Sequence, residues 1–232
     1  MTKRTVIVTG GFGALGRVVA AAFAAQGDLV ARVDYATTAP DAASVGLPAG
    51  YMDMGGVDLT DADAARHVVT RVTEAWGGVD VLVNIAGGFK WERLGTGSLD
   101  TWTRLYEMNA VTTATMTKAA LPSLLRRAGA RIINIGAKGA VHADDGMGAY
   151  AAAKSAVHRL TESLAAELAR EDITVNAVLP SIIDTPANRT DMPDADHGTW
   201  VSPQALADII LFLASPASRA ITGALVPVMR GA

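Results

Sequence analysis

The chain has 232 residues, of which 50% are hydrophobic, and its formal net charge is −3 at pH 7. This length fits one layered α/β domain, and the interspersed charges exclude a basic stripe for nucleic acid or a polybasic patch for a membrane surface. No apolar run approaches the roughly 20 residues that a membrane-spanning helix needs. The expected partner is therefore a small molecule.

Two residue types limit the chemistry further. The chain contains no cysteine, which excludes disulfides and thiolate metal sites and is typical of a reducing compartment, so we expect a cytoplasmic protein. The spacings of the four histidines match no metal-ligand motif, and we interpret each as an ordinary surface or core residue. No metal site is predicted. The histidines are His67, His142, His158 and His197.

The predicted elements alternate between strands and helices. Residues 5–10 form a short β-branched run that glycines interrupt too early for a signal-peptide core, so they are interpreted as a first strand. Ser202 is expected to cap the last helix, because a proline follows it at the first helical position. The other strands are expected at 29–34, 79–88, 131–136, 173–180 and 223–231, and helices at 17–27, 61–77, 100–127, 148–170 and 202–215.

Apolar strands separated by helices predict a parallel sheet that is covered on both faces. The fold class is therefore α/β, with a Rossmann-like doubly wound parallel sheet forming one dinucleotide-binding domain over 1–232. Two stretches have loop composition, 35–50 and 184–201. Because ligands of such folds bind beyond the carboxyl ends of the strands, the second stretch is predicted to be a substrate lid.

The sequence TGGFGALG at 9–16 lies directly between a predicted strand and a predicted helix. In that context glycines let the backbone approach a pyrophosphate, and the helix N-terminus offers unpaired amides. Asp34 ends the second strand, where a carboxylate accepts hydrogen bonds from the adenosine ribose and repels a 2′-phosphate. NAD(H) is therefore favoured over NADP(H), and Arg32, two positions earlier, weakens this preference only slightly. The cofactor-binding residues predicted in the turn are Gly10, Phe12, Gly13, Ala14 and Leu15.

Five segments, taken in order, resemble the short-chain dehydrogenase/reductase family along essentially the whole chain. They are the glycine turn, VDLTD at 57–61, NIAGG at 84–88, Asn109 in YEMNA, and Tyr150-x-x-x-Lys154. The resemblance implies that Tyr150, Lys154 and Asn109 are catalytic. The resemblance also implies cofactor contacts from Asp58 and Leu59 at the adenine, from Asn84, Ala86 and Gly87 at the ribose, and from Pro180, Ile183 and Thr185 at the nicotinamide.

Tyr150 and Lys154 share one helix face because they are four residues apart. A lysine ammonium close to a phenol favours the phenolate, so we expect the pKa of Tyr150 to lie below its reference of about 10. Such a shift makes the phenol a better proton donor. By the resemblance, Lys154 also holds the nicotinamide ribose hydroxyls, and Tyr150 is a cofactor-binding residue as well. The alternative is that the two residues are an ordinary solvated pair.

One position departs from the family pattern. Most members place a serine thirteen residues before the tyrosine, where this chain has Ala137, and residues 131–142 contain no serine or threonine. The loss of one donor to a developing oxyanion costs about 10²–10³ in rate. The segments 136–160 and 178–200 resemble dihydropteridine reductase, a subgroup that also lacks this serine. By that likeness, Phe89 is expected to stack on a flat ring, and the alternative is that it is an ordinary core or rim aromatic.

The predicted function is NADH-dependent reduction of a small pterin-like or quinonoid acceptor. Tyr150 is the proton donor, and Phe89, Ala137 and Tyr150 contact the substrate. One alternative is a reductase or dehydrogenase of a ketone, an alcohol or a 3-oxoacyl thioester, with another donor replacing the serine. A second alternative is a non-catalytic NAD-binding sensor. Family resemblance and the Ala- and Leu-rich helices predict a homodimer, with a homotetramer as the alternative.

Overall fold

The computed structural model describes residues 3–40 and 50–230, and its centre is a seven-stranded parallel sheet. The strand order is β3-β2-β1-β4-β5-β6-β7, so the order reverses between β1 and β4. The predicted doubly wound α/β fold is confirmed, and its reversal point is where such folds bind ligands. The strands are β1 (Thr5–Thr9), β2 (Leu29–Val33), β3 (Tyr51–Met54), β4 (Val81–Asn84), β5 (Ala130–Ile135), β6 (Ile173–Pro180) and β7 (Leu225–Val228).

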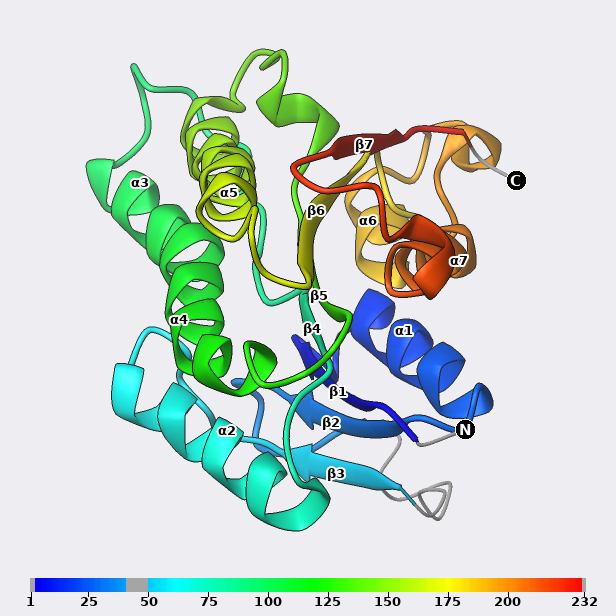
Figure 1. Ribbon diagram of the computed structural model, residues 1–232. Helices are drawn as coiled ribbons and strands as arrows, with labels where there is room; N and C mark the ends of the chain where they lie inside the picture. The colour runs from blue at the N-terminus through cyan, green and yellow to red at the C-terminus, as the bar shows by residue number, and fades with distance from the viewer. Residues whose placement is uncertain (1–2, 41–49, 231–232) are drawn as a thin grey trace.

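Helices cover both faces of the sheet (Figure 1). On one face, α1 (Ala14–Ala25) and α7 (Pro203–Leu213) pack on a core that includes Val6, Val8 and Ile133. On the other face, α2 (Ala62–Trp76), α4 (Thr112–Leu124) and α5 (Gly148–Glu167) pack on a core that includes Ile7 and Leu82. Alternate residues of β1 thus enter opposite cores, as expected of a strand that is buried on both sides.

Two elements differ from the sequence-based expectation. The four-residue strand β3 was not predicted, because its length gives little periodicity and it contains Asp53. The single helix expected at 100–127 consists of α3 (Leu99–Tyr106), a π-helical turn η1 (Glu107–Val111) and α4. A π-helical turn holds an extra residue, which hydrophobic spacing does not reveal, and such turns are frequent at functional sites.

Side-chain caps fix several helix starts. Asp61, Ser98 and Ser202 accept hydrogen bonds from backbone amides at the first turns of α2, α3 and α7, respectively. A cap of this type stabilises a helix by about 1 kcal/mol. The predicted Ser202 cap is therefore present. The N-cap of α1 is Gly13, which provides no side-chain cap.

The segment predicted to be a lid carries regular structure. It contains α6 (Pro186–Asp191) and the short helix η3 (His197–Thr199), and Trp200 is buried. A parallel bridge joins Ile183 to Val201, so the two ends of the segment lie side by side. Of the predicted loop 35–50, residues 41–49 lie outside the described part. Within the described residues, no helix is long and apolar enough to cross a membrane.

Candidate active site

The predicted site residues gather at the carboxyl ends of the central strands. Thr9 of β1 is in register with Asn84 of β4, and Asn84 is in register with Asn134 of β5. The Thr9 hydroxyl oxygen accepts hydrogen bonds from the backbone N–H groups of Ile85 and Ala86, each at 3.0 Å. The end of β1 thereby fixes the loop after β4 against the glycine turn.

The glycine turn between β1 and α1 leaves no room for a side chain at Gly10 or Gly16. Gly10 has a φ of 62°, in the left-handed region, and a Cβ at Gly16 would collide with the Gly10 carbonyl oxygen. The α1 N-terminus therefore approaches the turn closely, and no side chain caps its first amides. These amides and the positive end of the helix dipole fit the pyrophosphate of a dinucleotide.

Asp34 lies beside this turn. Its carboxylate oxygens accept hydrogen bonds from the Phe12 amide at 2.9 Å and from the Ala36 amide at 3.0 Å. The backbone of Asp34 also accepts from the Val57 amide, which brings Asp58 to the same end of the sheet. Hydrogen bonds from the Thr60 hydroxyl and amide lower the pKa of Asp58. The structure thus brings the predicted adenosine residues together.

Arg32 forms an ion pair that the sequence did not reveal. Its Nε and Nη2 donate to the two carboxylate oxygens of Asp53, each at 2.8 Å, and its side chain is 2% exposed. The guanidinium lies 5.5 Å from the ring centroid of Phe12 and 5.3 Å from that of Tyr51. Arg32 is thus engaged with β3 and two aromatic rings, which leaves Asp34 as the charged group at the strand end.

Tyr150, Lys154 and Asn109 converge on the loop after β4. Asn109 lies in the π-helical turn, and its amide nitrogen donates to the carbonyl of Gly88 at 3.0 Å while its amide oxygen accepts from the Gly88 N–H at 3.2 Å. A Cβ at Gly87 would lie 2.5 Å from Asn109 Oδ1 and 3.3 Å from Lys154 Nζ. A side chain at position 87 would therefore collide with these predicted catalytic groups.

The ionisation of Tyr150 differs from the sequence-based expectation. Burial raises the pKa of Tyr150 to about 12, and burial lowers the pKa of Lys154 to about 8. The expected lowering of the tyrosine pKa by Lys154 is therefore wrong for this state of the protein. The reason is geometric, because Lys154 Nζ donates to the Ile135 carbonyl at 2.8 Å and desolvation dominates at the phenol.

These pKa values predict a pH dependence for the free enzyme. Lys154 is charged below a pH of about 8 and neutral above it, whereas Tyr150 stays protonated up to about 12. If the charge of Lys154 holds the predicted cofactor, kcat/KM for that cofactor should be constant at neutral pH and fall as the pH rises through about 8. Initial rates with NADH as the varied substrate measure this profile. A profile that stays flat through this region would show that the charge of Lys154 is not required.

Ala137 offers no hydrogen-bond donor to a substrate. Its side chain is a methyl group, and its backbone N–H donates to His158 Nε2 at 3.2 Å. Its carbonyl accepts from the Ala140 amide at 3.1 Å, which begins the short helix η2 (Lys138–Ala140). Both backbone groups of Ala137 are thus engaged. The contact with His158 was not predicted, although its position four residues after Lys154 places it on the same helix face.

The Phe89 ring packs edge-to-face against the Tyr150 ring. The two ring centroids are 5.0 Å apart with an interplanar angle of 86°, and Phe89 is 55% exposed. The loop that follows is fastened to the segment before α5, because Trp91 Nε1 donates to the Asp145 carbonyl at 2.8 Å and Arg93 pairs with the Asp145 carboxylate at 2.6 Å. An exposed aromatic ring next to a loop that is held by these contacts is suited to contact a substrate.

The remaining predicted residues divide into two groups. The Asn84 amide nitrogen donates to Thr117 and Asn134 in the interior. Its amide oxygen is buried without a hydrogen-bond partner, so burial leaves only the backbone of Asn84 to border a ribose. The side chains of Leu15 and Leu59 are buried as well. At the carboxyl end of β6, Pro180 precedes the segment that holds the predicted nicotinamide contacts. That segment includes Ile183 of the bridge to Val201 and Thr185, the N-cap of α6.

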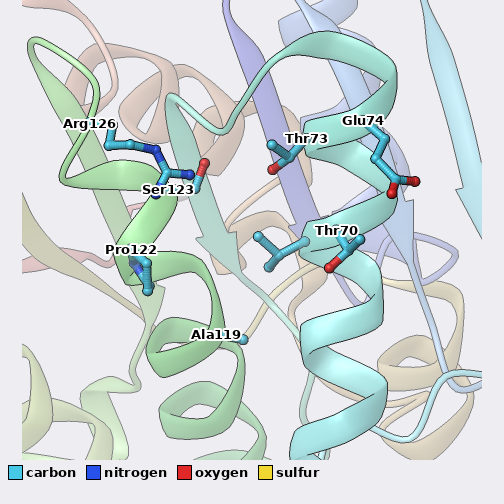
Figure 2. Close-up of a pocket in the computed structure, with 8 residues that line it drawn as sticks. Thr70, Thr73, Glu74, Ala119, Pro122, Ser123 and Arg126 are labelled. Atoms are coloured by element: carbon cyan, nitrogen blue, oxygen red, sulfur yellow. The ribbon is translucent and has the colours of Figure 1, made fainter.

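A separate cavity of about 230 Å³ lies between α2 and the end of α4 (Figure 2). Glu74 and Arg126 are its charged lining residues, and no predicted site residue lines it. This cavity lies between two helices and is therefore distinct from the predicted site at the carboxyl ends of the strands. Among the described residues, no group of three His, Asp or Glu side chains is arranged to hold a metal ion.

The chain is similar to known dehydrogenases and reductases. The short chain dehydrogenase family profile matches residues 4–196. A 3-oxoacyl-(acyl-carrier-protein) reductase of Thermotoga maritima is 29% identical, with 98% of this chain and 97% of that protein covered. The meso-2,3-butanediol dehydrogenase of Serratia marcescens is 31% identical, with 99% and 94% covered. The solved structure of a short-chain glucose/ribitol dehydrogenase from Brucella melitensis is 30% identical, covers 97% of this chain and 94% of its own, and has a TM-score of 0.90.

Proposed function

Because this chain belongs to the short-chain dehydrogenase/reductase family of oxidoreductases, we propose that it is an NADH-dependent reductase with Tyr150 as its proton donor. The observation that carries the proposal is the convergence of Lys154 and Asn109 on Gly87, with Tyr150 packed against Phe89 of the same loop, at the carboxyl ends of the strands. A non-catalytic NAD-binding sensor has no need of this convergence, since the glycine turn and Asp34 are sufficient to hold a dinucleotide.

The residues around the cleft have distinct proposed roles. When bound, the nicotinamide supplies the hydride. The glycine turn and the α1 N-terminus bind the pyrophosphate, and Asp34 accepts the hydrogen bonds of the adenosine ribose. Lys154 orients the second ribose. The Tyr150 hydroxyl, protonated at neutral pH, donates its proton to the acceptor atom that becomes electron-rich on reduction.

The acceptor that the site supports best is a conjugated ring of the pterin or quinonoid type. Ala137 provides neither a hydroxyl nor a free backbone N–H to stabilise an alkoxide. A quinonoid dihydropterin spreads the incoming charge over its ring system, so it depends less on such a donor. The exposed face of Phe89, held at right angles to Tyr150, can stack on a flat ring.

The second candidate is a carbonyl–alcohol pair, and the relatives support it. They are named for 3-oxoacyl-(acyl-carrier-protein), for butanediol and for glucose and ribitol, and none of these names indicates a pterin. For this candidate another group has to replace the missing serine. Steady-state assays of NADH oxidation with quinonoid dihydropterin and with a panel of ketones separate the two. A kcat/KM that is higher for every ketone than for the pterin would reject the conjugated acceptor.

The proposed preference for NADH depends on Asp34. We expect Asp34→Ala to raise the ratio of kcat/KM for NADPH to that for NADH by about tenfold or more, because the carboxylate no longer repels the 2′-phosphate or binds the ribose. Initial rates with each cofactor measure this ratio. Asp208→Ala is a suitable control, since Asp208 is an exposed carboxylate on α7 and is not among the predicted cofactor contacts. An unchanged ratio in Asp34→Ala would contradict the assignment.

The proposed assembly is a homodimer formed through the face of α3 and α5. A groove of about 480 Å³ lies there, lined by Trp102, Tyr106 and Ala152 among other residues, and Tyr106 is half exposed. An apolar face of this kind favours burial against a second copy. The proposed cytoplasmic location is supported only by the cysteine-free sequence. The segment 184–201, with α6 and η3, is proposed to cover the substrate.

A further inference from the structure

We propose that His158 is a positioning residue for Lys154, and that it acts by holding the end of β5 on which Lys154 is fixed. The inference rests on the proposed function, because it requires Lys154 to orient the cofactor. It concerns a histidine that belongs to neither the cofactor site nor the proton-transfer pair. The two parts of the proposal, the hydrogen bond and its effect on Lys154, can be tested separately.

Two successive turns of α5 hold the same short segment. Lys154 Nζ donates to the carbonyl of Ile135 at 2.8 Å, and the backbone N–H of Ala137 donates to His158 Nε2 at 3.2 Å. Lys154 and His158 are four residues apart and therefore lie on one face of the helix. The segment 135–137 is thus attached to α5 at its first carbonyl and at its last amide. Because only Gly136 separates the two bonded residues, a shift of the Ala137 amide would also move the Ile135 carbonyl that holds Lys154.

Gly136 lies between these two attachments, and its lack of a side chain makes room for the His158 imidazole. A Cβ at position 136 would lie 2.5 Å from His158 Nε2 and 3.1 Å from Leu179 Cδ1. The imidazole therefore fills the space in which a side chain at 136 would point. His158 is 2% exposed, so water does not compete for the Ala137 amide. The end of β5 is shaped by this contact.

The hydrogen bond defines the protonation state of His158. Because Nε2 accepts the Ala137 N–H, the ring is neutral and its proton resides on Nδ1. Burial lowers the pKa of His158 to about 4, and the positive charges of Arg159 and Lys154 act in the same direction. At neutral pH His158 therefore stays an acceptor and adds no charge beside Lys154.

Three variants test the positioning role. His158→Leu removes the acceptor, whereas His158→Gln keeps a neutral side chain that can accept the amide. Thr161→Val is the matched control: Thr161 is also buried on α5, and it accepts from Asn134 Nδ2 at 2.9 Å but forms no hydrogen bond with residues 135–137. Each variant is assayed as the full chain for kcat, KM for the acceptor, and Kd for NADH, with the folded fraction measured by circular dichroism.

We expect His158→Leu to lower kcat by about 10- to 100-fold, because small misplacements of a catalytic group have effects of this size. The KM for the acceptor should change less than kcat. His158→Gln should recover most of kcat, and Thr161→Val should leave kcat within about twofold of the wild type. A His158→Leu enzyme with wild-type kcat would overturn the proposal. So would an equal loss of kcat in folded Thr161→Val, since the role of His158 would then be merely structural.

A measurement that needs no activity covers the case in which His158→Leu fails to fold. The nitrogen spectrum of the histidine-labelled wild-type protein reports the tautomer of each of the four histidines, and His158→Gln assigns the signal of His158. The expected signal is that of an unprotonated Nε2 that does not titrate near the ordinary histidine pKa of 6.5. A protonated Nε2, or a titration near 6.5, would overturn the hydrogen-bond assignment whether or not the proposed reaction is correct.

Discussion

Tyr150→Phe is expected to lower kcat by about 10²–10⁴-fold on the best acceptor, which is the contribution typical of a positioned general acid. The phenyl ring keeps the edge-to-face contact with Phe89, so the shape of the site is preserved and only the proton is lost. The Kd for NADH should change little, since the cofactor is proposed to be held mainly by the glycine turn, Asp34 and Lys154. Steady-state kinetics and fluorescence titration with NADH measure the two quantities.

Tyr106→Phe is the control for this substitution. Tyr106 is a half-exposed tyrosine at the end of α3, and its hydroxyl has no proposed part in the reaction. Its removal should leave kcat unchanged. Lys154→Met should lower kcat and also weaken NADH binding, because the lysine is proposed to hold the ribose. Full turnover in Tyr150→Phe would reject the proton-donor role.

Ala137→Ser is expected to raise kcat/KM for ketones by about 10²-fold, because one well-placed donor to an oxyanion contributes an effect of 10²–10³. The hydroxyl would stand where the chain now presents a methyl group, beside an amide already bound to His158. Reduction of quinonoid dihydropterin should change much less, since that acceptor needs little polarisation. The change in the ratio of the two activities is the informative quantity.

Ala140→Ser provides the comparison, because it adds the same hydroxyl three residues further on, in η2. It should leave the ratio unchanged. If Ala137→Ser has no effect on any ketone while Tyr150→Phe does abolish turnover, a group other than residue 137 already polarises the carbonyl. The ketone-type candidate would then be favoured over the conjugated acceptor.

Local sequence signals were sufficient for most of the fold. The apolar run at β1 followed by glycines predicted the strand, the turn and α1, and the serine before Pro203 predicted the start of α7. These features depend on residues that are close together in the chain. The π-helical turn that carries Asn109 was not predicted, because one extra residue in a helical turn leaves the hydrophobic pattern almost unchanged.

The parts of the site that were missed depend on contacts between distant segments. The ion pair of Arg32 with Asp53 requires the pairing of β2 with β3. This pairing was not predicted, because β3 is too short to give a recognisable strand pattern. Spacing placed Tyr150 and Lys154 on one helix face, but it could not show that Lys154 donates to the Ile135 carbonyl. Burial, which sequence spacing does not measure, then sets the pKa of both groups.

Tyr150 and Lys154 are proposed to face a dinucleotide that is held at the glycine turn. A crystal structure of the protein with NADH bound would show whether they do. We predict that the pyrophosphate lies on the turn between β1 and α1, that Asp34 binds the adenosine ribose, and that Lys154 Nζ contacts the ribose beside Tyr150. A dinucleotide bound elsewhere, or one that leaves the Tyr150 hydroxyl out of reach of the nicotinamide face, would rule out the proposed site.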